Sequence, residues 1–141
     1  MALDVGTKTI GVAVSDALGM LAHPVTTVSR KGVRKDVIQI AAIIEERRVE
    51  RVIVGLPLEL DGTEERSARL ARQVGKAVRE STGLRVGYLD ERYSSVDAER
   101  QLIQADVSRS RRKEIIDQQA AVLILQSFLD SGESAVLDEE A

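Results

Sequence analysis

Short apolar, β-branched runs dominate the N-terminal part of the chain. Two of them, at residues 2–5 and 10–15, flank Gly6-Thr7-Lys8-Thr9, and this arrangement predicts a β-hairpin. Residues 24–29 predict a third strand. Residues 36–47 change to a helical period, with apolar side chains three and four positions apart. The pattern therefore predicts three antiparallel strands followed by a helix.

Extended and helical patterns alternate through the rest of the chain. The run RVIVGL at 51–56 is apolar after its first residue, which is typical of a parallel strand covered on both faces. Asp61-Gly62-Thr63 predicts a turn and the N-cap of a helix that extends to residue 81. The remaining predicted elements are a strand at 86–89, a helix from Ser94 or Ser95 to residue 105 and, after a basic loop, a helix at 113–129.

This order of elements predicts an α/β protein with a mixed five-stranded sheet. Three antiparallel strands come first, and two more strands are each reached through a helical crossover. Helices are expected on both faces of such a sheet. A chain of 141 residues has room for one ordinary domain, which we place at residues 1–131.

Composition excludes several classes of protein and of site. Hydrophobic residues make up 43% of the chain, which is too many for wholesale disorder. Cysteine is absent and histidine occurs once, so thiol catalysis, disulfides and metal centres built from cysteine or histidine clusters are excluded. No apolar run approaches the roughly 18 residues of a membrane span, and the N-terminus lacks the layout of a signal peptide. We therefore expect a cytoplasmic protein with no membrane partner.

The net charge of −3 is unevenly distributed. Residues 130–141 contain five acids and no base, which leaves 20 bases against 18 acids, a net charge of +2, in residues 1–129. We expect the acidic segment 132–141 to be a disordered tail. Two basic clusters, each compatible with a solvated face or a phosphate-binding surface, are Arg30, Lys31, Arg34 and Lys35, and Arg109, Arg111, Arg112 and Lys113.

Three carboxylates stand where catalysis would use them. Asp4 interrupts the first apolar strand, although acids are uncommon in strands. Glu91 follows the strand at 86–89, and ligands of open α/β sheets bind at the carboxyl ends of strands. Asp117 leads into the apolar stripe of the last helix. Each alone is also compatible with an ordinary strand, loop or helix acid, but the predicted fold allows the three to converge on one side of the sheet.

Three adjacent carboxylates repel one another unless a cation lies between them. Oxygen ligands suit Mg²⁺ or Mn²⁺, and two such ions roughly 4 Å apart activate water and stabilise the leaving oxygen in phosphodiester hydrolysis. Gly6 either serves the hairpin turn or lets a phosphate approach the backbone beside Asp4, where Lys8 would contact it. The same Asp-x-Gly-Thr pattern also suits the phosphate-binding hairpin of sugar kinases and actin-like ATPases.

Four blocks of sequence follow one another in a characteristic order: LDVGTKTIGVAVSD at 3–16, VGLPLELDGTEE at 54–65, DERYSSVDAE at 90–99 and IDQQAAVLIL at 116–125. In these blocks the chain resembles the YqgF/RuvX family of RNase H-fold proteins, described as pre-16S rRNA nucleases or Holliday-junction-resolvase-like proteins. The resemblance covers residues 2–130 and implies an RNase H-like fold with a metal-dependent acidic site at Asp4, Glu91 and Asp117. There are two departures: only three residues precede Asp4, and Ser94-Ser95 stand where the family commonly has Ser-Thr or Thr-Thr.

Further residues are candidates for binding nucleic acid. Arg92 would contact a phosphate or pair with Glu91, and Ser95 would cap a helix or contact a phosphate. The predicted loop containing Arg109, Arg111, Arg112 and Lys113 would hold the flanking backbone. The chain has only two tyrosines, one phenylalanine and no tryptophan, which argues against recognition of single strands by base stacking. Structured RNA or branched DNA is therefore the expected partner.

The leading hypothesis is a Mg²⁺- or Mn²⁺-dependent nuclease that matures the 5′ end of pre-16S rRNA, with the pre-ribosome as a partner. Resolution of Holliday junctions is the alternative within this class, and symmetric cleavage would favour a homodimer over a monomer. An alternative of another class is a non-catalytic nucleic-acid-binding protein of ribosome assembly. A phosphotransferase of the actin-like type is disfavoured, because those proteins need two such domains.

Overall fold

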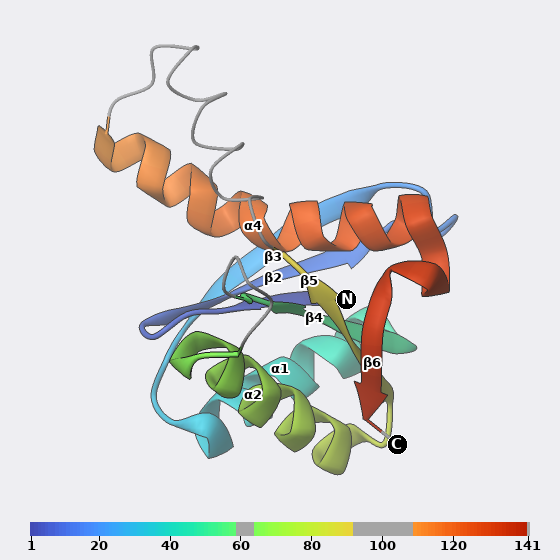
Figure 1. Ribbon diagram of the computed structural model, residues 1–141, viewed down its shortest axis with the longest axis horizontal. Coiled ribbons are helices and arrows are strands. Elements are labelled where there is room, and N and C mark those ends of the chain that lie inside the picture. Colours follow the sequence, from blue (N-terminus) through green and yellow to red (C-terminus); the bar gives the residue numbers. More distant parts are fainter. Residues whose placement is uncertain (59–63, 92–108, 141) are drawn as a thin grey trace.

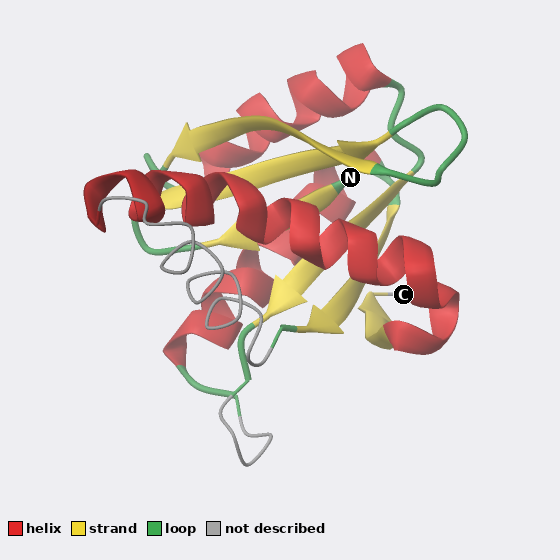
Figure 2. Ribbon diagram, turned by 90° about the horizontal axis from the view of Figure 1, so that it is seen from above, coloured by secondary structure: helices red, strands yellow, loops and turns green. Residues whose placement is uncertain are grey.

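The computed structural model describes residues 1–58, 64–91 and 109–140. In this part of the chain a six-stranded mixed sheet lies between two helical layers (Figure 1). Helices α1 (Val33–Arg47) and α2 (Arg66–Thr82) cover one face of the sheet, and α4 (Arg109–Ser131) crosses the other face (Figure 2). The prediction of a mixed sheet with helices on both faces is confirmed.

The first three strands form an antiparallel meander. They are β1 (Ala2–Val5), β2 (Thr9–Ser15) and β3 (Ala22–Ser29). The Gly6 N–H donates to the Thr9 carbonyl at 2.8 Å and closes the predicted hairpin. Because β3 lies at an edge of the sheet, it accommodates Pro24, which has no N–H to contribute to a strand ladder.

Two crossovers bring the next strands into parallel pairing. After α1, β4 (Arg51–Leu56) pairs with β1, and after α2, β5 (Arg85–Asp90) pairs with β4. The strand order is β3-β2-β1-β4-β5-β6. Because β1, β4 and β5 run in the same direction, their carboxyl ends meet at one edge of the sheet.

The C-terminal segment differs from the expectation of a disordered tail. Gly132–Ala135 form a 3₁₀ helix, and β6 (Val136–Glu140) pairs antiparallel with β5, which gives the sheet a sixth strand. Pairing with β6 covers the polar backbone groups that β5 would otherwise expose at the sheet edge. Gly87 in β5 accommodates this strand, since a Cβ built on it would lie 2.9 Å from Val136 Cγ1.

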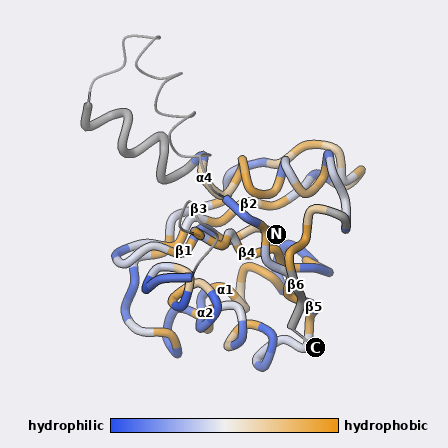
Figure 3. Tube along the Cα trace, viewed as in Figure 1, coloured by the Kyte–Doolittle hydropathy of each residue, from blue (hydrophilic) through white to orange (hydrophobic). Residues whose placement is uncertain are grey.

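Two apolar clusters fill the space between the layers. The cluster beneath α1 and α2 includes Leu3, Val54 and the fully buried Tyr88, whereas Leu89 and Ile124 belong to the cluster beneath α4. Figure 3 shows hydrophobic positions recurring along the strands and in both helical layers. The apolar character of β4 follows from its central place, because both of its faces are covered.

Two predicted element boundaries are wrong. Glu65 occupies the N-cap position of α2, so this helix does not begin at the predicted cap, 61–63, which lies outside the described residues. The basic residues Arg109, Arg111, Arg112 and Lys113 lie in the first turns of α4 and not in a loop. Arginine and lysine are good helix formers, and no glycine or proline interrupts residues 109–131. The helix predicted from Ser94 or Ser95 to residue 105 lies outside the described residues.

Candidate active site

Asp4 and Glu91 lie at the edge of the sheet where the parallel strands end. Asp4 is the last but one residue of β1 and pairs in register with Gly11 of β2. Glu91 immediately follows β5, and its backbone N–H donates to the Leu56 carbonyl at the end of β4, at 3.3 Å. The position of Glu91 is therefore set by the ends of two neighbouring strands.

Both carboxylates are on the face of the sheet that α4 covers. Residues two apart in a strand share a face, so Asp4 shares a face with Ala2, and the backbone that continues from β5 brings Glu91 to the side of Leu89. Ala2 and Leu89 both belong to the cluster that packs against α4. The neighbours of Asp4 in the strand, Leu3 and Val5, belong to the cluster on the opposite face.

Burial and two neighbouring acids act together on the Glu91 carboxyl. Burial raises the pKa of the Glu91 carboxyl to about 8, and the negative charges of Asp4 and Asp90 act in the same direction. In the absence of a cation, Glu91 is therefore mainly protonated at neutral pH. A buried acid beside a second acid is a site that a positive ion would stabilise, because the ion offsets both the repulsion and the loss of hydration.

Gly55 makes room for the Glu91 carboxylate, a role that its place in the sequence does not by itself reveal. A Cβ built on Gly55 would overlap both Glu91 Oε2 and Ile124 Cδ1 and would lie 3.0 Å from Glu91 Cδ. Any larger residue at this position would displace the Glu91 carboxylate, the Ile124 side chain or both. The available signal was a glycine inside an otherwise apolar strand, which often marks a close approach of another group.

Asp117 lies in α4, and the structure describes its backbone alone. It precedes Ala121 by four residues and Ile124 by seven, and both of these pack in the cluster beneath α4. Within the side chains that the structure describes, no three acidic or histidine groups gather as a metal site. The described part of the predicted trio is therefore the pair Asp4 and Glu91, and both supply the carboxylate oxygens that Mg²⁺ and Mn²⁺ prefer.

Lys8 is exposed in the turn between β1 and β2, at the same edge of the sheet as Glu91. Two other predicted phosphate contacts, Arg92 and Ser95, lie outside the described residues. The four basic residues of the predicted loop lie in the first turns of α4, the helix that covers Asp4 and Glu91.

In the part of the chain that is described, no helix is both long and apolar enough to cross a membrane.

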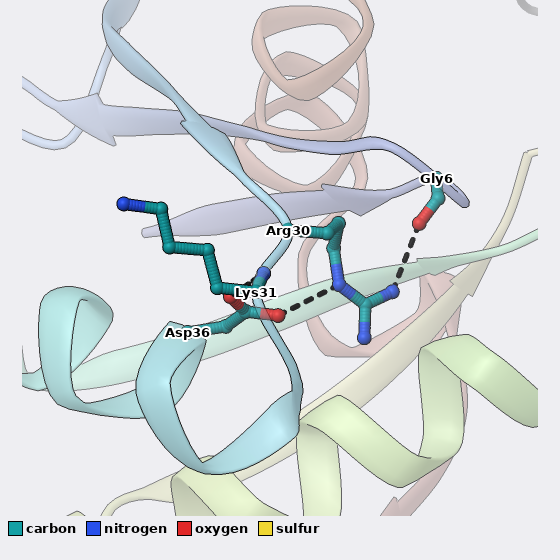
Figure 4. A network of polar contacts seen from close by, with 4 residues as sticks. All are labelled: Gly6, Arg30, Lys31 and Asp36. Atoms are coloured by element: carbon teal, nitrogen blue, oxygen red, sulfur yellow. Dashed lines mark hydrogen bonds and ion pairs between the residues drawn. The ribbon is translucent and has the colours of Figure 1, made fainter.

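The basic cluster near the end of β3, which comprises Arg30, Lys31, Arg34 and Lys35, divides into an internal and an external part. Lys31, Arg34 and Lys35 are exposed. Arg30 instead points into the protein and pairs with Asp36, the Nε–Oδ2 distance being 2.8 Å (Figure 4). The guanidinium of Arg30 is therefore held inside the protein and is not part of a solvated basic face.

Comparison with known proteins gives consistent matches over most of the chain. A model of the RuvX family, described as "Holliday junction resolvase", matches residues 1–131. A protein of Myxococcus xanthus named "Putative pre-16S rRNA nuclease" is 49% identical over 93% of this chain and 87% of its own length. A protein of the same name from Clostridioides difficile is 48% identical over 92% of each chain.

A solved structure shares the fold. T. thermophilus RuvC in complex with Holliday junction substrate superposes with a TM-score of 0.54 over 96% of each chain, at 19% sequence identity. This likeness concerns the fold alone, which is of the RNase H-like type. Fold and relatives together define the class of the protein, a nuclease with an RNase H-like fold. Within that class, the chain belongs to the RuvX family.

Proposed function

We propose that this protein is a divalent-metal-dependent nuclease that hydrolyses phosphodiester bonds in structured nucleic acid, with the 5′ end of pre-16S rRNA as its main substrate. The observation that carries the proposal is the buried Glu91 carboxyl beside Asp4, at the edge of the sheet and beneath α4. Two acids held together in this way suit an oxygen-ligand cation.

Asp4, Glu91 and Asp117 would hold the ion. Asp117 is included because residues four and seven apart share a helix face, and Ala121 and Ile124 both pack in the cluster under α4. When bound, Mg²⁺ or Mn²⁺ supplies Lewis-acid chemistry, lowering the pKa of a coordinated water and offsetting charge on the phosphate. The protein fixes the carboxylates through strand β1, the end of β5 and helix α4, and Gly55 keeps space for Glu91.

Basic residues around this edge would hold the nucleic-acid backbone. Lys8 is exposed in the β1–β2 turn. Arg109, Arg111, Arg112 and Lys113 are in the first turns of α4, the helix that covers the face with Asp4 and Glu91. Arg92 and Ser95, which follow Glu91 in the sequence, would add contacts next to the cleaved bond. Contacts of this kind position the backbone and carry no sequence information.

Pre-16S rRNA is favoured as substrate by the names of relatives that are 48–49% identical to this chain. A second candidate, the four-way DNA junction, is favoured by the description of the matching family. The first would make the pre-ribosome a partner, and the second would favour a homodimer with two sites related by two-fold symmetry.

A parallel cleavage assay tests the proposal. The protein is incubated with a precursor-rRNA duplex and with a four-way DNA junction, in Mn²⁺, in Mg²⁺ and in EDTA. We expect cleavage of the RNA only with metal, and its loss in Asp4→Asn, Glu91→Gln and Asp117→Asn. Glu80→Gln is the matched control, because Glu80 is exposed on α2 at the opposite face of the sheet.

Two results would contradict the proposal in different ways. Preferential cleavage of the junction would show that the proposed substrate is wrong and would leave the proposed metal site in place. Binding of RNA without cleavage, together with no metal binding by calorimetry, would favour a non-catalytic protein of ribosome assembly.

A further inference from the structure

A buried ion pair between Arg30 and Asp36 connects helix α1 to the β1–β2 turn. Asp36, in the first turn of α1, is 1% exposed. One of its oxygens accepts from Arg30 Nε at 2.8 Å, and the other accepts from the Lys31 backbone N–H at 2.8 Å. Both carboxylate oxygens are thus engaged, which fixes the orientation of the Asp36 carboxylate that holds Arg30 Nε.

Arg30 holds the turn at two points. Its Nη1 donates to the Gly6 carbonyl at 2.9 Å, as Figure 4 shows, and its backbone N–H donates to the Lys8 carbonyl at 2.8 Å. The turn also closes on itself through the Gly6–Thr9 hydrogen bond. The backbone on either side of Thr7 is therefore tied to one arginine, which is itself tied to α1.

The held segment lies at the proposed active site. Gly6 is two residues after Asp4, and the turn is at the same sheet edge as Glu91. Lys8, the exposed cation of this turn, is a proposed phosphate contact. A phosphate contact helps catalysis only if its place relative to the acids is fixed, because misplacement by about 1 Å costs up to about a hundredfold in rate.

We propose that Arg30, anchored by Asp36, is a positioning residue that sets the Gly6–Lys8 turn so that Lys8 meets the substrate phosphate beside Asp4. The inference rests on the proposed nuclease function. It also assigns a role to a basic residue that composition alone groups with a solvated cluster. Arginine is needed because its planar fork reaches the Asp36 carboxylate and the Gly6 carbonyl at once, whereas a lysine ammonium is a point donor.

A double-mutant cycle between Arg30 and Lys8 tests the proposal. Arg30→Lys keeps the positive charge beside Asp36 but loses the simultaneous hold on Gly6. In the wild-type background, we expect Lys8→Ala to lower kcat/KM about tenfold and to reduce the salt slope of binding to a duplex DNA by about 0.9. In the Arg30→Lys background, we expect Lys8→Ala to change kcat/KM by less than about threefold and to leave the salt slope unchanged.

Gly6→Ala serves as a second variant in case Arg30→Lys fails to fold. A Cβ at this position would lie 3.1 Å from the Thr9 carbonyl, so it shifts the turn while leaving the Arg30–Asp36 pair intact. The same loss of the Lys8 effect is expected. Arg51→Lys is the matched control, because Arg51 pairs with Glu133 at the opposite end of the sheet. It should lower the melting temperature and leave the full effect of Lys8→Ala.

The outcomes separate this inference from the proposed function. If the effects of the Arg30 and Lys8 substitutions are instead independent, they multiply in kcat/KM and add in the salt slope. That result would overturn the positioning role and leave the nuclease proposal intact. If the wild-type protein binds the duplex but does not cleave with any metal, the nuclease proposal fails. The salt slopes then still decide whether Arg30 positions Lys8.

Discussion

At the scale of single residues, Glu91 shows how burial and charge prepare a site for a cation. The folded protein holds this carboxyl among apolar neighbours and beside Asp4, so its pKa rises from 4.5 to about 8. The unfolded chain has no such environment and loses the proton near pH 4.5. Between these two pH values the Glu91 carboxyl therefore binds more protons in the folded state than in the unfolded state, and its contribution to stability without metal falls as the pH rises.

Glu91→Gln should remove this dependence. Glutamine has nearly the same shape and no charge, so we expect the variant to gain roughly 1–3 kcal/mol over the wild type at pH 8 and nothing at pH 4.5. Thermal melting in EDTA across this range measures the difference. Glu80→Gln, on the opposite face of the sheet, keeps Glu91 and should therefore differ from the wild type in stability by the same amount at every pH. A Glu91→Gln variant whose stability differs from that of the wild type by the same amount from pH 5 to pH 8 would contradict the burial of Glu91.

Gly55→Ala should displace the Glu91 carboxylate and weaken metal binding. The added Cβ would meet Glu91 and Ile124 together, so we expect a loss of roughly 1–3 kcal/mol in stability and at least tenfold weaker Mn²⁺ binding. Gly75→Ala is the matched control, because a Cβ there would overlap the Tyr88 hydroxyl on the opposite face of the sheet. It should cost stability without changing metal affinity. Wild-type Mn²⁺ affinity in Gly55→Ala, measured by calorimetry, would remove Gly55 from the site.

At the scale of elements, the sequence was most informative where one pattern dominated. Short apolar, β-branched runs and the glycine turn predicted the hairpin of β1 and β2, and residues 24–29 predicted most of β3. The apolar run at 51–56 predicted strand β4 with the same bounds as the structure. Local pattern also located Asp4 and Glu91. It did not reveal Gly55 as a partner of Glu91, because that contact joins β4, β5 and α4 across the fold. The hydrogen bond from Arg30 to the Gly6 carbonyl could not be predicted either, because it joins residues that are 24 positions apart in the sequence.

β6 illustrates how composition misleads at the end of a chain. The acids at 138–140 suggested disorder, yet the backbone of this segment pairs with β5. Strand pairing depends on a partner edge, and that edge is supplied by residues about fifty positions earlier. The apolar Val136, packed near Gly87, was the local sign of an ordered segment.

Truncation after residue 131 should therefore destabilise the protein. Removing Gly132–Ala135 and β6 leaves β5 as an unpaired edge, so we expect a loss of about 2 kcal/mol in urea unfolding and increased self-association. A full-length variant with Asp138→Asn, Glu139→Gln and Glu140→Gln separates charge from pairing and should keep most of the stability. An unchanged urea midpoint in the truncated protein would instead indicate a tail that contributes nothing to the fold.

At the scale of the whole molecule, the layered architecture brings together groups that are far apart in sequence. Asp4 comes from the first strand, Glu91 from the end of the fifth, and both lie beneath the helix that contains Asp117. The elements that build the proposed metal site are thus the same elements that build the core under α4. Binding of a cation at this point should stabilise the fold as a unit, because the unfolded chain has no equivalent site.

Metal binding and proton release should accordingly be linked. Glu91 is mainly protonated below pH 8 in the absence of metal, and a carboxyl must lose its proton to coordinate an ion. We therefore expect the apparent Mn²⁺ association constant to fall by up to about tenfold per pH unit from pH 8 to pH 6. Calorimetry in two buffers with different ionisation enthalpies should register the release of up to one proton per protein at pH 6.5. Glu91→Gln should bind weakly and release none. A wild-type affinity that stays constant between pH 6 and pH 8 would mean that the ion does not displace the proton of Glu91, and the metal would then have to be held elsewhere.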